Sequence, residues 1–277
     1  IYEAARWCGL SIDAPVDISA LIDRKAARDA MAEAEAAKDA VSKAALVDAL
    51  LAQAEAVTGS PAAAYLATRG ITALPHDWYY LPPVSALGVL HPERAALMVP
   101  AVDDDGIIRG GQRILILPDG SKAPEQTRKP SFGSIGGFPA RISAQVSGGP
   151  LIVCEGPETA AAIAQATGFE VWAVFGVSGF KTAPAPTGRK VVFCPDQDAA
   201  GSPAANSFAA ACLAQVERGI DLWIAKAPED EGSKRDLNDT LQRAGAEAVI
   251  SAINLAYAAE ATAPRDGKGR FTGQGVV

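Results

Sequence analysis

The chain has 277 residues, enough for one large domain or two modest ones, and 49% of them are hydrophobic, so it can bury a core. Its 25 basic and 32 acidic side chains give a formal net charge of −7, so overall charge does not indicate a nucleic-acid-binding protein. No apolar stretch approaches the roughly 20 residues that cross a membrane, and no signal peptide is visible. We therefore expect a cytoplasmic protein without a membrane partner.

The four cysteines do not form a CxxC metal-binding pair. Cys154 and Cys194 lie in apolar runs, where a buried reduced thiol is the usual state, and this is typical of a reducing compartment. The first residue is Ile1 rather than Met, so we expect the chain to be a fragment whose N-terminal portion is missing.

The N-terminal region, residues 1–57, is expected to be helical. Residues 1–10 favour a short helix that ends near Gly9, and the Ala-rich stretch 18–57 has helical spacing of its apolar residues. Asp17 or Ser19 is a candidate cap for the longer helix. Because the middle of this helix is weakly apolar, it is expected to be an exposed arm or linker rather than part of a core.

Residues 58–147 are expected to form a small β-rich subdomain. A short helix over 58–71 has Thr58 or Ser60 as its N-cap, and strands are expected over 96–102 and 107–117. The dipeptides that follow these strands, Asp105-Gly106 and Asp119-Gly120, are typical of hairpin turns. The stretch from Gly106 to Arg141 is basic, because only Asp119 and Glu125 oppose Arg109, Arg113, Lys122, Arg128, Lys129 and Arg141.

From residue 148 to 260 the pattern alternates between strand and helix, which predicts a parallel or mostly parallel sheet with helices on both faces. The Gly-rich tail 261–277 is expected to be a flexible linker. The expected strands are 150–154, 170–176, 189–194 and 220–227, and the expected helices are 157–168, 201–219, 236–245 and 246–261.

Acidic residues follow three of these strands. Glu155 comes directly after strand 150–154, Asp196 and Asp198 follow strand 189–194, and Asp236 and Asp239 follow strand 220–227. Open α/β sheets bind ligands at the carboxyl ends of their strands, and converging carboxylates repel unless a cation lies between them. Magnesium prefers carboxylates, water and phosphate, and two such ions can serve phosphoryl transfer. Taken singly, each acid also has a structural interpretation; Asp236, for example, could be a helix N-cap.

The segments CEGPETAAAIA, FCPDQDAAG and KRDLNDTL resemble the three motifs of the Toprim domain, which bacterial primases, topoisomerases and several nucleases share. The resemblance implies a Rossmann-like α/β fold. It implies that Glu155 is a general acid/base or metal-associated group, and that Asp196 and Asp198 bind Mg²⁺ or Mn²⁺. Asp236, with Asp239 beside it, would add to the metal site, whereas Glu158 would have a supporting role.

The resemblance extends upstream. IIRGGQRILILPDGSKA and TRKPSFGSIGG are similar to the basic subdomain that precedes Toprim in primases, and YLATRGI is similar to a segment of phage and mobile-element primases. IYEAARWCGLSI resembles the segment that joins a zinc-binding module to the core. These likenesses imply the catalytic core of a phage- or plasmid-type DNA primase, with a single-stranded DNA template, NTPs and a replicative helicase, fused or separate, as partners. The implied nucleotide and DNA contacts are Arg109, Arg113, Lys129 and Arg141.

Two alternatives remain open at this point. The same acidic site could hydrolyse nucleic acid, as in Toprim nucleases, although the basic subdomain upstream disfavours this. A Toprim domain that has lost catalysis could act as a nucleic-acid-binding scaffold, although the intact Glu155, Asp196 and Asp198 disfavour that. A topoisomerase is least supported, because none of the five tyrosines lies in a recognisable DNA-gate setting.

Overall fold

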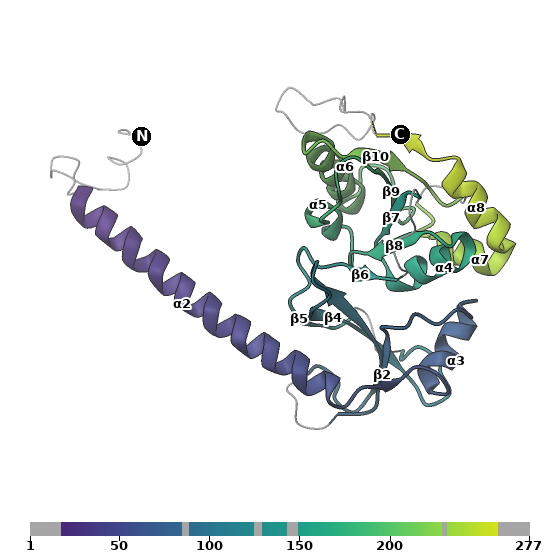
Figure 1. The fold of residues 1–277 in the computed structure, drawn as a ribbon, viewed down its shortest axis with the longest axis horizontal. Helices are drawn as coiled ribbons and strands as arrows, with labels where there is room; N and C mark the ends of the chain where they lie inside the picture. Colours follow the sequence, from purple (N-terminus) through teal and green to yellow (C-terminus); the bar gives the residue numbers. More distant parts are fainter. Residues whose placement is uncertain (1–17, 85–88, 125–128, 143–148, 229–231, 260–277) are drawn as a thin grey trace. The chain divides into compact units, whose positions relative to one another are not determined.

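The computed structural model of the protein describes residues 18–84, 89–124, 129–142, 149–228 and 232–259 (Figure 1). These residues belong to two compact units, which divide between Ser42 and Lys43. The helix expected over 1–10 and the tail 261–277 lie outside the described residues. No helix among the residues described is long and apolar enough to span a membrane.

The first unit is formed by most of a 34-residue helix, α2 (Ile18–Leu51). Its many alanines favour the helical state, and the side chains from 22 to 42 are exposed. In the last turns, which belong to the second unit, Val47 and Leu50 are buried. The helix ends six residues before the expected residue 57, because residues 55–56 instead pair with a strand.

A short helix, α3 (Pro61–Thr68), opens the part of the chain that faces the site. Ser60 is its N-cap, since its hydroxyl accepts a hydrogen bond from the amide of Ala62 at 3.2 Å. Tyr65 is buried on the inner side of the helix, and Arg69 forms its C-cap.

The first sheet is antiparallel, with strands in the order β1-β2-β3-β4-β5. Its longest pair, β3 and β4, turns at the expected Asp105-Gly106. Gly111 in β4 is required by packing, because a Cβ there would lie 2.2 Å from the carbonyl oxygen of Val99. The strands are β1 (Glu55–Ala56), β2 (Tyr79–Leu81), β3 (Ala95–Val102), β4 (Ile108–Ile116) and β5 (Ser131–Gly133).

The second sheet has the order β11-β10-β9-β7-β8-β6, in which the four central strands are parallel. The two edge strands, β6 and β11, are antiparallel to their neighbours. The sheet is therefore mostly parallel, as the alternating pattern predicts. Its strands are β6 (Ala140–Arg141), β7 (Leu151–Cys154), β8 (Glu170–Ala173), β9 (Lys190–Cys194), β10 (Asp221–Ile224) and β11 (Tyr257–Ala258).

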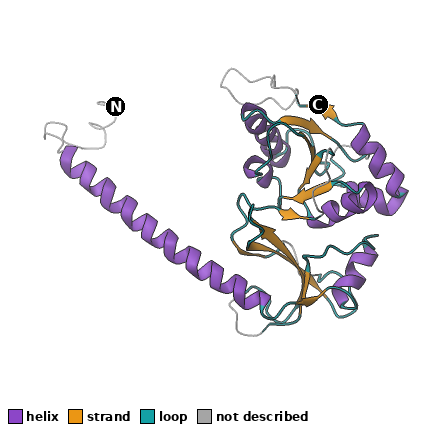
Figure 2. Ribbon diagram, viewed as in Figure 1, coloured by secondary structure: helices purple, strands orange, loops and turns teal. Residues whose placement is uncertain are grey.

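Helices cover both faces of the second sheet, as Figures 1 and 2 show. Alternate strand residues point to opposite faces, so Ile152 packs in one hydrophobic cluster and Val153 in another. The first cluster contains residues of α4 (Pro157–Thr167), α7 (Leu237–Ala244) and α8 (Ala246–Asn254), and the second contains residues of α5 (Gly179–Thr182) and α6 (Pro203–Glu217).

The first cluster also contains one face of the first sheet, through Leu97 and Ile114. The two sheets therefore share a continuous core around α4. The other face of the first sheet packs on the end of α2 in a separate cluster that includes Leu50, Met98 and Leu115.

The structure corrects three element boundaries. The final helix ends at Asn254 instead of residue 261, because Tyr257 and Ala258 form β11 against β10. The strand expected over 170–176 ends at Ala173, and its last residues form a loop at the site. Arg141 lies in β6 of the second sheet rather than in the β-rich subdomain that precedes it.

Candidate active site

Two acidic residues meet where neighbouring parallel strands end. Cys154 and Cys194 are partners in the register of β7 and β9, so the residues that follow them emerge at the same edge of the sheet. The amide of Asp196 donates a hydrogen bond of 3.4 Å to the carboxylate of Glu155. The strand ends therefore bring these two acids together, as expected from their positions in the sequence.

Asp236 joins this edge from the start of α7. It is the N-cap of that helix, and one of its carboxylate oxygens accepts hydrogen bonds from the amides of Asn238 and Asp239. The other oxygen accepts a hydrogen bond of 2.7 Å from the hydroxyl of Thr159 in α4. Asp239 completes a capping box by accepting a bond from the amide of Asp236, so its side chain is turned toward the helix terminus.

The carboxylates at the acidic edge are partly buried and repel one another, so their charged forms are disfavoured. Burial raises the pKa of Asp196 to about 8, helped by the neighbouring charges of Glu155 and Asp236. Burial also raises the pKa of Glu155, and the charge of Asp198 adds to the effect. Without a counter-charge, this edge holds a proton near neutral pH.

The chemistry of these residues fits a hard divalent cation. Partly buried carboxylates whose pKa is raised by one another are the groups that such a cation stabilises. Among the residues described, however, no three acidic, His or Cys side chains lie close enough to hold one ion together. Glu155 and Asp196 are adjacent, and Mg²⁺ is commonly held by one or two carboxylates with water and phosphate completing its shell.

Opposite the acids, Glu158 anchors a basic group. This buried carboxylate lies 2.6 Å from the ammonium of Lys129 and accepts a hydrogen bond of 2.9 Å from the hydroxyl of Tyr65. Burial alone would raise the pKa of Glu158, but Lys129 and the hydrogen bonds hold it at about 2. Glu158 is therefore ionised, and it links α4 to α3 and to Lys129, two residues before β5.

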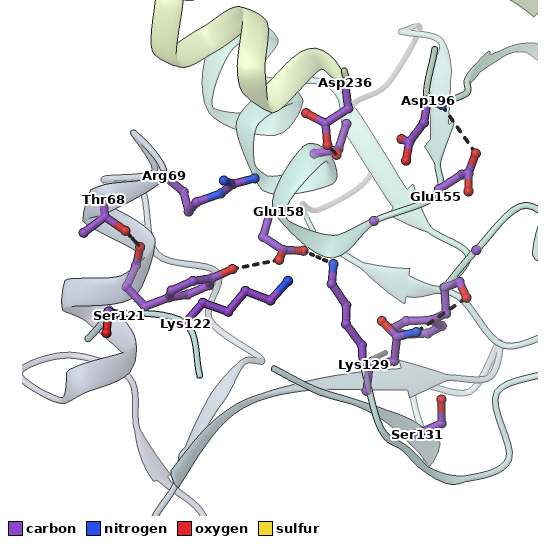
Figure 3. Close-up of a pocket in the computed structure, with 16 residues that line it drawn as sticks. Thr68, Arg69, Ser121, Lys122, Lys129, Ser131, Glu155, Glu158, Asp196 and Asp236 are labelled. Atoms are coloured by element: carbon purple, nitrogen blue, oxygen red, sulfur yellow. Dashed lines mark hydrogen bonds and ion pairs between the residues drawn. The ribbon is translucent and has the colours of Figure 1, made fainter. Parts of the chain in front are cut away.

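The acids and bases face a common cavity of about 830 Å³. In Figure 3 Arg69, Lys122 and Lys129 lie around Glu158, whereas Glu155 and Asp196 lie together at the upper right and Asp236 lies above Glu158. This size is in the range of small-molecule sites. A cavity with cations on one wall and clustered carboxylates on the other suits a metal ion together with a polyanionic ligand.

The second sheet and its helices correspond to a known family. Residues 150–247 match the Toprim domain family. This part of the chain is a Toprim domain. Residues 41–142 match a domain of unknown function, DUF7146. No curated protein matches the sequence.

The solved structures that resemble the chain include primase cores. A DnaG primase catalytic domain bound to single-stranded DNA has 17% identity and a TM-score of 0.53, with 80% of this chain and 81% of that chain covered. A DNA primase domain from Pseudomonas aeruginosa also has 17% identity and a TM-score of 0.53, with 78% and 79% covered. The Aquifex aeolicus primase, comprising zinc-binding and RNA polymerase domains, has 15% identity and a TM-score of 0.50; the match covers 80% of this chain and 61% of that one. At these identities the likeness establishes the fold.

The structure brings together only part of the expected site. Of the acids, Glu155, Asp196 and Asp236 line the cavity beside the Toprim strands, whereas Asp198 and Asp239 are not among its lining residues. Asp198 nevertheless lies near enough for its charge to raise the pKa of Glu155.

Of the four basic residues expected to bind nucleotide or DNA, Lys129 alone is among the lining residues. Arg109 pairs with Asp103 at 2.6 Å, and Arg141 pairs with Asp104 and lies over the ring of Trp172. Arg113 needs a correction, because it is 1% exposed and its guanidinium donates to the carbonyl of Leu90. Arg113 lies on the face of the first sheet that packs against α2. Its register partner in the neighbouring strand β3 is Met98, which belongs to the cluster on that face.

Its neighbour Gln112 points to the opposite face and lines the cavity instead. The cavity is also lined by Arg69, Tyr65, Gln112 and Phe175, none of which was expected at the site. Arg69 and Tyr65 belong to the segment YLATRGI, and Gln112 belongs to IIRGGQRILIL, so these motifs carried a signal. Phe175 had no local pattern that could identify it.

Proposed function

We propose that this chain is the catalytic core of a DNA primase, which synthesises short primers on single-stranded DNA by metal-dependent nucleotidyl transfer. The observation that carries the proposal is the cavity in which Glu155 and Asp196 face Lys122 and Lys129. A nucleoside triphosphate presents a metal-binding polyphosphate, for which both walls are suited. The first sheet supports a primase over a Toprim nuclease, because the likeness to primase cores extends over both sheets.

In this proposal Glu155 and Asp196 hold Mg²⁺ or Mn²⁺, and Asp198 and Asp236 contribute negative charge nearby. The cation, when bound, supplies charge neutralisation at the phosphates. The 3′-hydroxyl of one nucleotide attacks the α-phosphate of the next, and pyrophosphate leaves. As the alternative to holding the cation, Glu155 assists transfer of the hydroxyl proton, a role that its raised pKa suits.

The basic wall binds the phosphates. Lys122 and Arg69 line the cavity opposite the acids, and Lys129 is held in place by Glu158. These fixed cations balance the charge of the leaving pyrophosphate. Arg109 and Arg141, which lie outside the cavity, are proposed contacts for the template backbone, where sequence-independent ion pairs position the strand.

The segment YLATRGI supports a primase of phage or plasmid type. Single-stranded DNA as template is supported by the similar DnaG catalytic domain, which was solved bound to single-stranded DNA. We propose a replicative helicase, fused or separate, as the further partner of a cytoplasmic enzyme.

The test is incubation of the protein with single-stranded DNA, labelled NTPs and Mg²⁺ or Mn²⁺. We expect labelled oligonucleotides that depend on both template and metal, and their loss in Glu155→Gln and Asp196→Asn. Lys181→Gln, an exposed substitution outside the cavity, is the matched control and should retain synthesis. Shortened template without new oligonucleotides would favour the nuclease, and binding without either product would favour a scaffold.

A further inference from the structure

The loop that follows β8 holds an aromatic residue in an unusual backbone conformation. Phe175 has φ +60, in the left-handed region that is unfavourable for a bulky side chain. Backbone hydrogen bonds maintain this conformation: the amide of Val174 donates to the carbonyl of Cys154, and that of Gly176 to the carbonyl of Glu155. The backbone of Phe175 is thus held in a fixed position relative to the main chain of Glu155, a proposed catalytic acid.

Phe175 is also joined to the first sheet. The side-chain amide of Gln112 in β4 donates to the carbonyl of Phe175 at 3.5 Å. Both residues line the cavity, and Gln112 is otherwise buried. Contacts from two sheets therefore orient the loop, and backbone strain that persists under such restraint is often found at functional sites.

Of the two aromatic residues among those described as lining the cavity, Phe175 is the more exposed. Tyr65 is 3% exposed, and its hydroxyl is bound to Glu158. Phe175 is half-buried: it packs against the central hydrophobic cluster, and it also lines a cavity whose other lining residues are mostly polar or charged. A flat apolar surface in such a cavity is suited to a planar ligand group that covers it.

We propose that Phe175 is the platform on which a nucleobase stacks while the phosphates of the same ligand lie between the acidic edge and the basic wall. The inference rests on the proposed function, because it takes the ligand to be a nucleotide or a DNA strand. Every base has a π-face, so stacking on Phe175 contributes affinity without base selection. The base belongs either to the incoming nucleotide or to the template, and both sources present the same chemistry.

The test removes the ring and keeps the loop. Asn tolerates positive φ, so Phe175→Asn preserves the backbone conformation, whereas Phe175→Tyr preserves the ring. Binding is measured by calorimetry in Mg²⁺ for ATP, inorganic triphosphate, a short oligothymidylate and an abasic strand of the same length. We expect Phe175→Asn to lower the affinity for one or both base-containing ligands by about tenfold or more. The affinities for the base-free ligands should not change. Phe175→Tyr should bind all four ligands like the parent.

The four ligands separate the outcomes. A loss of affinity for ATP alone assigns the platform to the incoming nucleotide. A loss of affinity for oligothymidylate alone assigns it to the template. Equal binding of ATP and oligothymidylate by parent and Phe175→Asn overturns the platform and leaves the proposed function standing. An equal loss for base-free and base-containing ligands also overturns it, because the cavity itself has then changed. If the parent binds none of the four ligands, the proposed function falls together with this inference.

Phe138→Asn is the matched control, since it removes a half-buried phenylalanine that does not line the cavity, and all four affinities should be retained. If Phe175→Asn does not fold, Phe175→Leu makes the same comparison, because leucine keeps apolar bulk but has no aromatic face.

Discussion

At the scale of single residues, the most consequential contacts are those of Glu158. Glu158 is 5% exposed; Lys129 neutralises its carboxylate and the hydroxyl of Tyr65 donates a hydrogen bond to it, and both partners come from distant parts of the chain. A buried ion pair is costly to form, but breaking it by removing one partner leaves a charge without compensation. Glu158 therefore orients Lys129 within the cavity and also stabilises the junction between the sheets.

Glu158→Gln is expected to lower the free energy of unfolding by about 3 kcal/mol at pH 7. The pKa of Glu158 is lowered from 4.5 to about 2, so the ionised group stabilises the fold fully above pH 4.5. This stabilisation is lost as pH falls from 4.5 toward 2, and the gap between parent and variant should close over that window. Urea titrations at several pH values measure it, with the exposed Glu217→Gln as control.

At the same scale, Asp196 is buried and is repelled by the neighbouring carboxylates of the acidic edge, which raise its pKa. Asp196→Asn removes one charge from this edge, so the metal-free variant should be at least as stable as the parent. A ligand that binds only the folded state raises stability in proportion to RT ln(1 + [L]/Kd), so stabilisation by Mg²⁺ should shrink in the variant. Thermal melts with and without Mg²⁺ provide the measurement. A variant that gains as much from Mg²⁺ as the parent would remove Asp196 from the metal site.

At the scale of elements, the start of α7 combines capping with charge. Asp236 accepts two amides of its own helix, and its position on the cavity gives its charge a second role. Asn is also a good N-cap, whereas Ala is not. The two substitutions therefore separate the two roles.

Asp236→Ala should cost about 1 kcal/mol of stability through loss of the cap, whereas Asp236→Asn should cost much less. Both remove the charge, so both should reduce the stabilisation by Mg²⁺ if Asp236 acts on the cation. Chemical denaturation with and without Mg²⁺ distinguishes the cap from the charge. Unchanged Mg²⁺ stabilisation in both variants would restrict Asp236 to capping.

Strand β4 illustrates how one position decides whether a residue reaches the site. Gln112 lines the cavity, and Arg113 is buried on the opposite face. Two basic residues that line the cavity follow this strand: Lys122, in the segment after the Asp119-Gly120 turn, and Lys129.

Lys122→Gln is expected to weaken binding of single-stranded DNA or ATP and to reduce the slope of log affinity against log salt by about one phosphate contact. Arg113→Met and the exposed Lys181→Gln should leave that slope unchanged, because neither side chain lines the cavity. Fluorescence anisotropy at several salt concentrations measures all three. A slope that falls in Arg113→Met but not in Lys122→Gln would show that Arg113, and not Lys122, contacts the phosphates.

At the scale of the whole molecule, the cavity exists because two sheets share one hydrophobic cluster. Leu97 and Ile114 of the first sheet pack in the same cluster as Ile152 and Val192 of the Toprim domain. Neither sheet alone provides both walls. The joint packing brings a basic wall to an acidic edge, and a protein with a net charge of −7 thereby gains a site suited to a polyanion.

From the sequence alone we could predict the alternation of strands and helices, the hairpin turn at Asp105-Gly106 and the meeting of Glu155 with Asp196. These features are local, or follow from the rule that parallel strands end at a common edge. The helix expected over 246–261 was wrong beyond Asn254, because pairing of Tyr257 with Ile224 depends on a strand far back in the chain.

Long-range packing, by contrast, selects the side chains that face the cavity. The choice between Gln112 and Arg113 depends on which face of β4 packs against the Toprim domain, because strand side chains alternate with a period of two. The contacts of Glu158 join residues 29 and 93 positions away, and the conformation of Phe175 depends on hydrogen bonds from two sheets. Such arrangements depend on long-range packing, which composition and local periodicity do not specify.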